Sequence, residues 1–510
     1  MRIKLLVVAV LVALTGGPLV ANTLPASWGK SAKPVAEVDL RHFAALDATK
    51  VRSEDQLLTA AGEPLRFAVA HAVKMNPANS GTLESSKDGT SVWRQRISAS
   101  GALSLNLGFT RFQMAPGEAL WIYTPDRRQV IGPLTEKDND AHGEYWSPVL
   151  LGGELIIELA SAAAQPKSRI ELTRVNHGYR FFGTHQFGKS STADSGSCAS
   201  VPKPGTPLAK MLGESGYDKS GSCNMDVECL LPADPWRETA KAIGAYTLGG
   251  TLTCSGALIN NTAQDRKMLF MTADHCGISA ANASTVVVYW NHESPTCRTP
   301  GTAASGGTPA AYPADRANSG AFFRSDFAGS DFNILELDDA PPAAARLSWM
   351  GWDRSSADSQ CSSSNLCAGI HHPSVDEKRI TFVEQTMATT SYGNPASPGN
   401  GTHIWVHWDP TPVFPPTGQV INTPQVTEGG SSGSPLFNAS RHFIGQLHGG
   451  PSACGSTGDD LSDFYGRLSA SWEGGGTAAT RARDWLDPLG TAPNTLGELG
   501  QAEGFANGFE

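Results

Sequence analysis

Short apolar segments recur along most of this chain, and turns rich in Gly, Pro and Asn separate them. Segments this short form strands more readily than helices, because an amphipathic helix needs a longer run of 3.6-residue periodicity. The pattern predicts an all-β protein built from barrels or sandwiches. Strands are expected at 66–75, 103–112, 119–123, 154–160, 242–253, 258–259, 268–272, 284–290, 332–337, 404–408, 444–448 and 464–468. The main expected helix covers 478–486, ahead of Asp487 and Pro488.

The 510 residues allow more than one hydrophobic core, and the composition indicates where the chain divides. A stretch rich in Ser, Gly, Pro and Lys at 188–216 predicts an exposed linker. We expect a β-rich region with this linker at 22–219, without a catalytic motif, and a second all-β domain at 220–490. A flexible Gly-rich tail is expected at 491–510.

The first 21 residues have the arrangement of a secretory signal peptide. Arg2 and Lys4 precede an apolar run at 5–14, which ends at Gly16-Gly-Pro18 and is too short to span a bilayer. The chain has 39 basic and 49 acidic residues, and its net charge of -10 argues against nucleic acid and membrane surfaces as partners. We therefore expect a secreted protein.

Nine cysteines in an exported chain predict disulfides rather than metal ligands, because thiols pair and stay paired in an oxidising compartment. Eight of them lie between Cys223 and Cys454. Cys198 is the odd one and lies in the linker. An even set remains if proteolysis removes the segment before the second domain.

The segment Glu428-Gly-Gly-Ser-Ser-Gly-Ser-Pro435 predicts a tight loop that presents a nucleophile, although Gly/Ser runs are more often flexible loops. We prefer Ser432 over Ser431 and Ser434, because glycines flank the Ser431-Ser432 pair. Those glycines allow a turn that aims the N–H groups of Gly430 and Ser432 at one point, as an oxyanion hole requires. Losing one such donor costs about 3 to 4 kcal/mol of transition-state stabilisation.

Two upstream segments supply the other members of a catalytic triad. His275 is the candidate general base, and Cys276 beside it can anchor it by pairing with Cys254. Asp331 precedes an apolar strand, so its carboxylate would lie at the strand edge and orient the imidazole. A turn-capping aspartate is the alternative for Asp331. The chain order His, Asp, Ser is that of chymotrypsin-type enzymes and favours the catalytic interpretation.

Several other histidines have no Cys or Glu partner at ligand spacing: His371, His372, His403 and His407. We expect solvated or packed roles for them. The sequence therefore predicts neither a metal nor another cofactor.

Several motifs follow one another between Ser220 and Pro488. They are Ser222-Cys-Asn-Met-Asp-Val-Glu-Cys229, Thr272-Ala-Asp-His-Cys-Gly277, Val287-Val-Tyr-Trp-Asn291, Ser330-Asp-Phe332, Gly351-Trp-Asp353, Ile370-His-His-Pro373, Gly430-Ser-Ser-Gly-Ser-Pro435, Gly445-Gln-Leu-His-Gly-Gly-Pro451 and Asp463-Phe-Tyr-Gly-Arg467. In these motifs the chain resembles the lysyl endopeptidase family of secreted bacterial serine proteases. The first 200 residues resemble that family's pro-region less distinctly. The resemblance implies a chymotrypsin-like double β-barrel, made as a precursor, that cuts peptide bonds on the carboxyl side of lysine.

The resemblance also assigns the primary substrate pocket. Asp463 takes the pocket-base position, where a carboxylate can pair with the ammonium of a substrate lysine, and Thr427 and Gly450 belong to the same pocket. Other acids compete for this role on sequence alone, or are solvated loop acids: Asp459, Asp460 and Glu428.

Further roles follow from the same resemblance. Trp408 and His448 match a tryptophan and a histidine that the family places beside the catalytic imidazole. The implied disulfides are Cys223–Cys454, Cys229–Cys297 and Cys254–Cys276, with Cys361 and Cys367 left to close a small local ring.

Activation is expected to differ from that of chymotrypsin relatives, which pair a new N-terminal amine with an aspartate. Ser431 stands at that position, so we expect removal of the pro-region to relieve steric blockage instead. Lys219 is the expected self-cleavage point. The pro-region can also serve as a folding template, because double β-barrels have many contacts distant in sequence.

The expected partners are proteins or peptides with lysine at the cleavage site and the chain's own propeptide, and we expect a monomer. The nearest alternative is a protease that accepts both arginine and lysine. A non-catalytic binding protein with the protease fold would need a damaged triad. The N-terminal β region is alternatively a retained adhesion or carbohydrate-binding domain.

Overall fold

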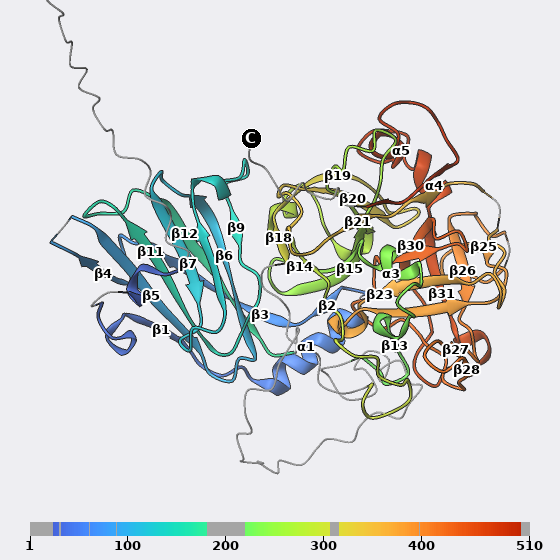
Figure 1. Cartoon of the computed structure of the whole chain (residues 1–510), viewed down its shortest axis with the longest axis horizontal. Helices are drawn as coiled ribbons and strands as arrows, with labels where there is room; N and C mark the ends of the chain where they lie inside the picture. Colours follow the sequence, from blue (N-terminus) through green and yellow to red (C-terminus); the bar gives the residue numbers. More distant parts are fainter. Residues whose placement is uncertain are drawn as a thin grey trace, which may run out of the picture.

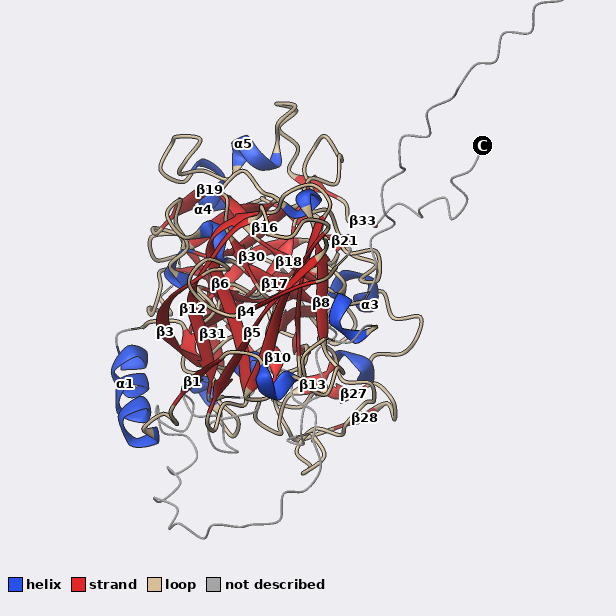
Figure 2. Cartoon of the chain, turned by 90° about the vertical axis from the view of Figure 1, so that its left-hand side faces the viewer, coloured by secondary structure: helices blue, strands red, loops and turns tan. Residues whose placement is uncertain are grey.

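The computed structural model describes residues 24–29, 32–60, 62–87, 89–180, 220–305, 316–356, 358–396 and 398–500. The expected signal peptide and linker, Cys198 and Lys219 lie outside them. A two-layered N-terminal part lies beside a larger β-rich part (Figure 1). Strands fill the centre of the molecule, and its few helices lie at the edges (Figure 2). Within the described segments, every helix is too short or too polar to cross a lipid bilayer.

The N-terminal part is a β-sandwich. Its first sheet contains β1 (Leu40–Phe43), β4 (Thr82–Ser85), β5 (Ser91–Ala99), β7 (Glu118–Tyr123), β8 (Val130–Leu134) and β11 (Glu154–Ser161). The second contains β3 (Ala68–Met75), β6 (Ser104–Gln113), β9 (Tyr145–Trp146), β10 (Leu150–Leu151) and β12 (Arg169–Gly178). Alternate apolar residues of both sheets, such as Ile97 and Leu107, form one shared core. The four strands predicted here correspond to β3, β6, β7 and β11.

Two antiparallel sheets follow and form the double β-barrel. The first contains β14 (Ile243–Leu248), β15 (Leu252–Leu258), β16 (Leu269–Ala273), β17 (Val287–Trp290), β18 (Ala317–Ser319), β19 (Ala321–Phe327) and β20 (Phe332–Leu337). The second contains β13 (Met225–Asp226), β22 (Trp352–Asp353), β23 (Cys367–His371), β24 (Arg379–Val383), β25 (Ala388–Thr390), β26 (His403–His407), β29 (Pro435–Phe437), β30 (Phe443–Gly449), β31 (Ser462–Arg467) and β32 (Thr495–Leu496). The all-β prediction is confirmed.

Three apolar cores hold the two barrels. One lies in each barrel, and a third joins residues of both, including Ile334 from the first and Ile370 from the second. The predicted strand at 242–253 is in fact a hairpin. Gly249 and Gly250 both have positive φ (59° and 67°), which lets β14 turn into β15 within two residues.

The sandwich docks on the first barrel through a strand, an apolar cluster and polar contacts. The short strand β2 (Leu65–Arg66) pairs antiparallel with β15, opposite Leu252 and Thr253. Phe67 and Trp146 of the sandwich share an apolar cluster with Tyr289 of the barrel. His142 Nε2 lies 2.7 Å from the Asp338 carboxylate across the same interface.

The helices differ from the prediction. They are α1 (Ala48–Ala60), α3 (Trp236–Ala240), α4 (Leu468–Glu473) and α5 (Arg483–Leu486). The helix expected at 478–486 is wrong for its first half, because the segment before α5 forms a turn and the Trp485 indole donates to the Ala478 carbonyl. The long helix α1 was not expected.

The expected flexible tail at 491–510 is wrong for its first ten residues. β32 pairs with β22, and β33 (Leu499–Gly500) pairs with β21 (Ser348–Trp349). The remaining small hairpin is formed by β27 (Val413–Phe414) and β28 (Gln419–Val420). Strand pairing uses backbone groups alone, so a segment poor in large side chains can still join a sheet.

Leu499 is partly buried against the core of the first barrel. Leu499→Ala should therefore lower the unfolding free energy of the double barrel by about 1 to 2 kcal/mol, because it removes apolar burial. Leu489 is 62% exposed and supplies the matched control, which should change stability by less than about 0.5 kcal/mol. Thermal unfolding of both variants measures this. Equal midpoints would contradict the docked tail.

Candidate active site

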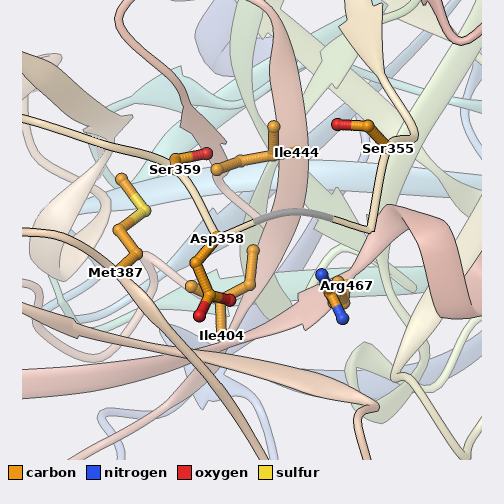
Figure 3. Close-up of a pocket in the computed structure, with 7 residues that line it drawn as sticks. All are labelled: Ser355, Asp358, Ser359, Met387, Ile404, Ile444 and Arg467. Carbon is orange, nitrogen blue, oxygen red and sulfur yellow. The ribbon is translucent and has the colours of Figure 1, made fainter. Parts of the chain in front are cut away.

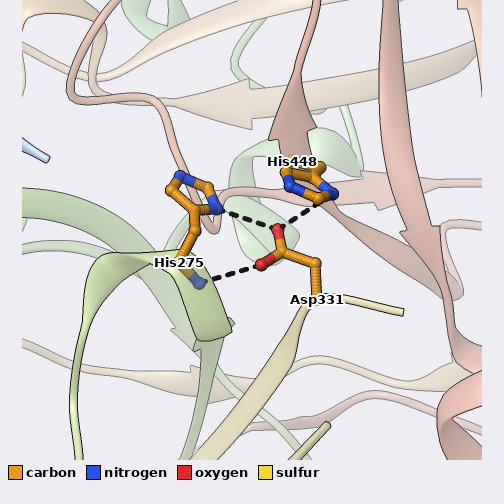
Figure 4. A group of neighbouring side chains, drawn as sticks. All are labelled: His275, Asp331 and His448. Atoms are coloured by element: carbon orange, nitrogen blue, oxygen red, sulfur yellow. Dashed lines mark hydrogen bonds and ion pairs between the residues drawn. The ribbon is translucent and has the colours of Figure 1, made fainter. Parts of the chain in front are cut away.

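His275 and Asp331 meet at the edge of the first barrel. His275 lies in the short 3-10 helix η5 (Asp274–Cys276) after β16, and Asp331 directly precedes β20. The Asp331 carboxylate accepts from the backbone N–H of His275 at 2.9 Å through Oδ1 and lies 2.9 Å from His275 Nδ1 through Oδ2 (Figure 4). This double contact fixes the ring plane, and it requires the proton on Nδ1, which leaves Nε2 as the basic nitrogen.

The backbone at Asp331 is strained in a way that serves this contact. Its φ is +57°, a left-handed conformation that is unfavourable for most side chains but tolerated by aspartate. Its carbonyl accepts from the Asp274 N–H at 3.0 Å. Asp331 is therefore joined to η5 through both its backbone and its side chain.

The Ser432 loop is attached to the first barrel next to His275. Ser255 of β15 donates its N–H to the Ser432 carbonyl and its hydroxyl to the Gly430 carbonyl, both at 2.8 Å. A Cβ on Gly433 would lie 2.8 Å from the Ala273 nitrogen, so only glycine allows the loop to approach the chain that leads into His275. The loop thus joins the two barrels at the predicted triad.

The loop leaves two backbone donors available. In the described part of the chain, neither the Gly430 nor the Ser432 N–H is used in a hydrogen bond. Gly430 has φ of +90°, and a Cβ there would lie 3.0 Å from the Val375 nitrogen. A positive φ and this close approach to Val375 both require glycine at position 430.

The environment of the three loop serines separates them. Ser431 is fully buried, and its hydroxyl lies 2.8 Å from His371 Nδ1. Ser434 is also fully buried, whereas Ser432 is partly exposed. Among the described residues no hydrogen bond joins Ser432 to His275. Such bonds are often long in unliganded enzymes and shorten when substrate binds.

A second imidazole lies on His275. His448 of β30 stacks on it with ring centres 5.3 Å apart, and His448 Nδ1 lies 3.6 Å from Asp331 Oδ2 (Figure 4). The sequence assigned His448 to this place. It missed Tyr392, which stacks on the opposite face of His448 at 3.6 Å, and His403, whose Nε2 lies 2.9 Å from His448 Nδ1. No motif marks Tyr392, because its loop is far from the other residues in sequence.

Trp408 differs from the sequence assignment. Instead of lying beside the His275 ring, it is fully buried and its indole N–H donates to Asp463 Oδ2 at 2.7 Å. The aromatic ring that stacks on His448 is instead that of Tyr392.

Asp463 is buried at the start of β31 and is held by neutral donors. Oδ2 accepts from the Trp408 indole, from the Thr427 hydroxyl at 2.7 Å and from the Ser452 hydroxyl at 2.5 Å. A Cβ on Gly450 would lie 2.4 Å from Asp463 Oδ1, so glycine keeps the approach to this carboxylate open. The three residues assigned to the primary pocket are therefore neighbours in space.

The competing acids lie elsewhere. Asp459 and Asp460 are exposed, as solvated loop acids are. Glu428 is buried and accepts from Gly221 N at 2.7 Å, Asn224 Nδ2 at 2.8 Å and the Ser374 hydroxyl at 2.9 Å. Burial raises the pKa of Glu428 to about 7, and those hydrogen bonds oppose the rise. Glu428 thereby ties the beginning of the second domain to the Ser432 loop.

The described chain contains four disulfides, and they are the pairs that the resemblance implies: Cys223–Cys454, Cys229–Cys297, Cys254–Cys276 and Cys361–Cys367. Cys254–Cys276 joins β15, which carries Ser255, to η5, which carries His275. The base and the support of the nucleophile loop are thus covalently linked.

The remaining histidines have packed environments. His371 is buried between Ser431 and Thr381, and burial lowers its pKa to about 3. His372 Nδ1–H donates to the Asp376 carbonyl at 2.9 Å, and His407 Nε2 lies 3.7 Å from Asp459 Oδ1. Two clusters of His and Asp residues place possible metal-ligand atoms within 4.8 Å of one another. One is the cluster around Asp331, and the other consists of Asp140, His142 and Asp338. Hydrogen bonds or ion pairs join the members of each.

A small cavity at the far end of β31 is separate from these residues (Figure 3). It is lined by Ser355, Asp358, Ser359, Met387, Ile404, Ile444 and Arg467. The Arg467 guanidinium donates to the Ser356 carbonyl, and Asp358 accepts from the Thr389 N–H at 3.0 Å. Its two charged side chains therefore both have partners within the protein.

Sequence comparisons agree with these motifs. The family model for the lysyl endopeptidase C-terminal domain matches residues 217–466, and the one for the lysyl endopeptidase N-terminal domain matches 40–178. A lysyl endopeptidase from Pseudomonas aeruginosa is 27% identical over 476 residues, covering 89% of this chain and 91% of that protein.

Solved structures match the chain in part. A protease from M. tuberculosis in its active form is 15% identical, with 47% of this chain and 82% of that chain covered and a TM-score of 0.27. A Glu endopeptidase is 13% identical, with 48% and 90% covered and a TM-score of 0.26. The HtrA-type protease AlgW is 14% identical, with 45% and 57% covered and a TM-score of 0.28.

Glu428 gives a pH-dependent contribution to stability. Its pKa rises from 4.5 to about 7 on folding, so the folded state keeps a proton that the unfolded state releases between these values. The native state is therefore destabilised as pH rises through that window, by on the order of 3 kcal/mol at most. Glu428→Gln should gain stability over the unchanged protein between about pH 5 and pH 8, measured by thermal unfolding.

Asp460, an exposed acid, supplies the control. Asp460→Asn should keep the same difference from the unchanged protein at both pH values. A constant difference for Glu428→Gln as well would show that this carboxyl does not take up a proton on folding.

Proposed function

Because the chain belongs to the lysyl endopeptidase family and is a serine endopeptidase, we propose that Ser432, His275 and Asp331 are its catalytic triad. The observation that carries this proposal is the double contact of His275 with Asp331 beside a loop with two unused N–H groups. We further propose that it cuts after lysine and is exported as a precursor.

The chemistry follows from the positions of these groups. His275 Nε2 takes the proton of the Ser432 hydroxyl as Oγ attacks the scissile carbonyl, while Asp331 holds the Nδ1–H and stabilises the imidazolium. The N–H groups of Gly430 and Ser432 face the oxyanion. The imidazolium then protonates the leaving amine, and water attacks the acyl-enzyme by the same route.

Lysine specificity is supported by Asp463. Its carboxylate is the acid that lies with Gly450 and Thr427, and Trp408 and Ser452 hold it in place. A substrate ammonium would add a positively charged donor to this buried carboxylate, whereas an apolar side chain would add none. A site that also accepts arginine is the alternative, because charge alone does not distinguish the two cations.

The docking of the sandwich supports a precursor held inactive by its N-terminal part. β2 pairs with Leu252 and Thr253, two residues before Ser255, which supports the nucleophile loop. Leu65 Cδ1 lies 4.0 Å from the position of a Cβ on Gly429. A peptide that crosses the active site beyond the scissile bond would meet β2 there. Removing the N-terminal part would clear this edge.

The first residue of the second domain is also prepared for cleavage. Ser220 is buried and its N–H donates to Asp376 Oδ2 at 3.0 Å, and Lys219 directly precedes it. An amine formed at Ser220 would therefore face the carboxylate of Asp376, although position 431 carries a serine. Four disulfides and the expected signal peptide favour export.

Digestion of an unrelated protein tests activity and specificity together. We expect cuts after lysine, and Ser432→Ala should lower the rate by about 10⁵- to 10⁶-fold because the nucleophile is lost. Mapping of cut sites by mass spectrometry measures this. Cleavage by Ser432→Ala at the rate of the unchanged protein would contradict the proposed triad. Absence of cleavage by both the variant and the unchanged protein would favour a non-catalytic binding protein.

Asp463→Asn separates specificity from catalysis. It keeps the hydrogen bonds of the pocket but removes the charge, so cleavage after lysine should fall by on the order of 10³-fold or more while a small uncharged ester is still hydrolysed. Side-by-side Lys and Arg esters distinguish strict lysine specificity from acceptance of both. Unchanged lysine cleavage in this variant would exclude Asp463 as the pocket acid.

N-terminal sequencing of the processed protein tests maturation. We expect Ser220 as the first residue, and the Lys219→Gln full-length chain should stay uncut and nearly inactive. Adding Leu65→Asp to that chain places a charge in the β2 contact and should raise its residual activity severalfold. Maturation at a site without lysine, or full activity of the uncut chain, would contradict the proposal.

A further inference from the structure

A line of hydrogen bonds leads away from the triad behind Asp331. His448 Nδ1 lies 2.9 Å from His403 Nε2, and His403 Nδ1 lies 2.8 Å from the Thr402 hydroxyl. The Thr402 hydroxyl lies 2.6 Å from Asn400 Oδ1. His403 is buried at the start of β26, and this line connects it to the loop before that strand.

The far end of the line fixes the position of every proton in it. The Thr402 backbone N–H donates to Asn400 Oδ1 at 3.1 Å, which identifies that atom as the amide oxygen. The Thr402 hydroxyl must then donate its only proton to Asn400, so it can only accept from His403 Nδ1–H. A neutral His403 consequently accepts at Nε2, and His448 must donate from Nδ1.

Burial favours the neutral form of both imidazoles. Burial and, to a smaller extent, the neighbouring His448 lower the pKa of His403 to about 4, against the opposing effect of Asp331. Burial also lowers the pKa of His448, against the opposing effect of Asp331. The titratable groups that face His448 are His275, Asp331, His403 and Tyr392, and Tyr392 remains protonated because burial raises its pKa.

We propose that Asn400, Thr402 and His403 are positioning residues that hold His448 in its Nδ1–H tautomer and so keep the lone pair of the neutral ring away from the Asp331 carboxylate. The inference rests on the proposed triad. Tyr392 and His275 clamp the two faces of the His448 ring, so its plane is fixed and only its tautomer can change. The line of hydrogen bonds then determines which ring nitrogen of His448 carries the proton.

The tautomer matters because Asp331 is buried and needs donors. With Nδ1–H, the proton is donated to His403 Nε2, and the ring nitrogen 3.6 Å from Asp331 Oδ2 presents no in-plane lone pair to the carboxylate. In the other tautomer a lone pair would face the carboxylate. Asp331 would then stabilise the His275 imidazolium more strongly, raise the pKa of the base and leave less neutral imidazole at neutral pH.

Nitrogen-15 NMR of the histidine side chains in the full-length Ser432→Ala chain tests the tautomers without using activity. Long-range couplings distinguish Nδ1–H from Nε2–H, and single His→Gln variants assign the signals. We expect both His403 and His448 to carry the proton on Nδ1. An Nε2–H signal for His448 would overturn the proposal.

Thr402→Val tests the consequence for catalysis, because it keeps the shape of the side chain and removes the hydroxyl. The acid limb of the kcat/KM profile against pH should move to higher pH by roughly half a unit, and Thr402→Ser should restore it. A lower kcat with an unmoved limb, or the same shift in Thr402→Ser, would reduce Thr402 to a structural role and overturn the proposal.

Thr386→Val is the matched control. Like Thr402, Thr386 donates its hydroxyl to a side-chain amide oxygen, in this case that of Gln360 in an exposed loop. Among the described residues, no hydrogen bond joins this pair directly to His448. It should leave the profile unchanged. If the chain does not cut after lysine, the tautomer measurement still decides the inference; if cleavage occurs but the tautomers differ, only this inference fails.

Discussion

The buried carboxylate of Asp331 is the group around which the functional part of the molecule is arranged. An unpaired buried charge is costly, so the fold must bring donors to it from other segments. Two come from His275, and the His448 imidazole, which belongs to the other barrel, lies 3.6 Å away. The positive φ of Asp331 is stable only because these contacts and the first barrel determine it together.

The same junction explains why the two barrels must pack as they do. Ser255 lies in the first barrel, yet its two hydrogen bonds hold the carbonyls of Gly430 and Ser432, which lead into the second. The apolar core shared by both barrels keeps this distance fixed. A shift of either barrel would therefore move the Ser432 loop relative to His275, and for the proposed triad a misplacement of about 1 Å is enough to reduce catalysis strongly.

The sequence predicts the parts of this arrangement that depend on local motifs. The strands, the nucleophile loop, His275 and Asp331 are each recognisable within a few residues, because their backbone requirements restrict the local composition. What it could not predict depends on partners distant in the chain. Tyr392 joins the site by stacking on His448, and the tail strands form only because β21 and β22 offer free edges. The family resemblance alone implies a place for Trp408 beside the imidazole, whereas its buried indole donates to Asp463.

Three buried carboxylates near the Ser432 loop are stabilised in different ways, and the difference agrees with their separate roles. Glu428 receives two N–H donors and one hydroxyl, and its raised pKa lets it hold a proton, as a structural link can. Asp463 receives hydroxyls and an indole, which fix its position while bringing no positive charge of their own. Asp331 receives imidazole and backbone N–H groups, one of which must gain a full charge during the reaction. A carboxylate with neutral partners can still attract a cation from outside the protein. A carboxylate that already faces imidazoles instead stabilises their protonated form. The partners of each acid therefore agree with a role for Asp463 toward the substrate and for Asp331 toward the proposed base.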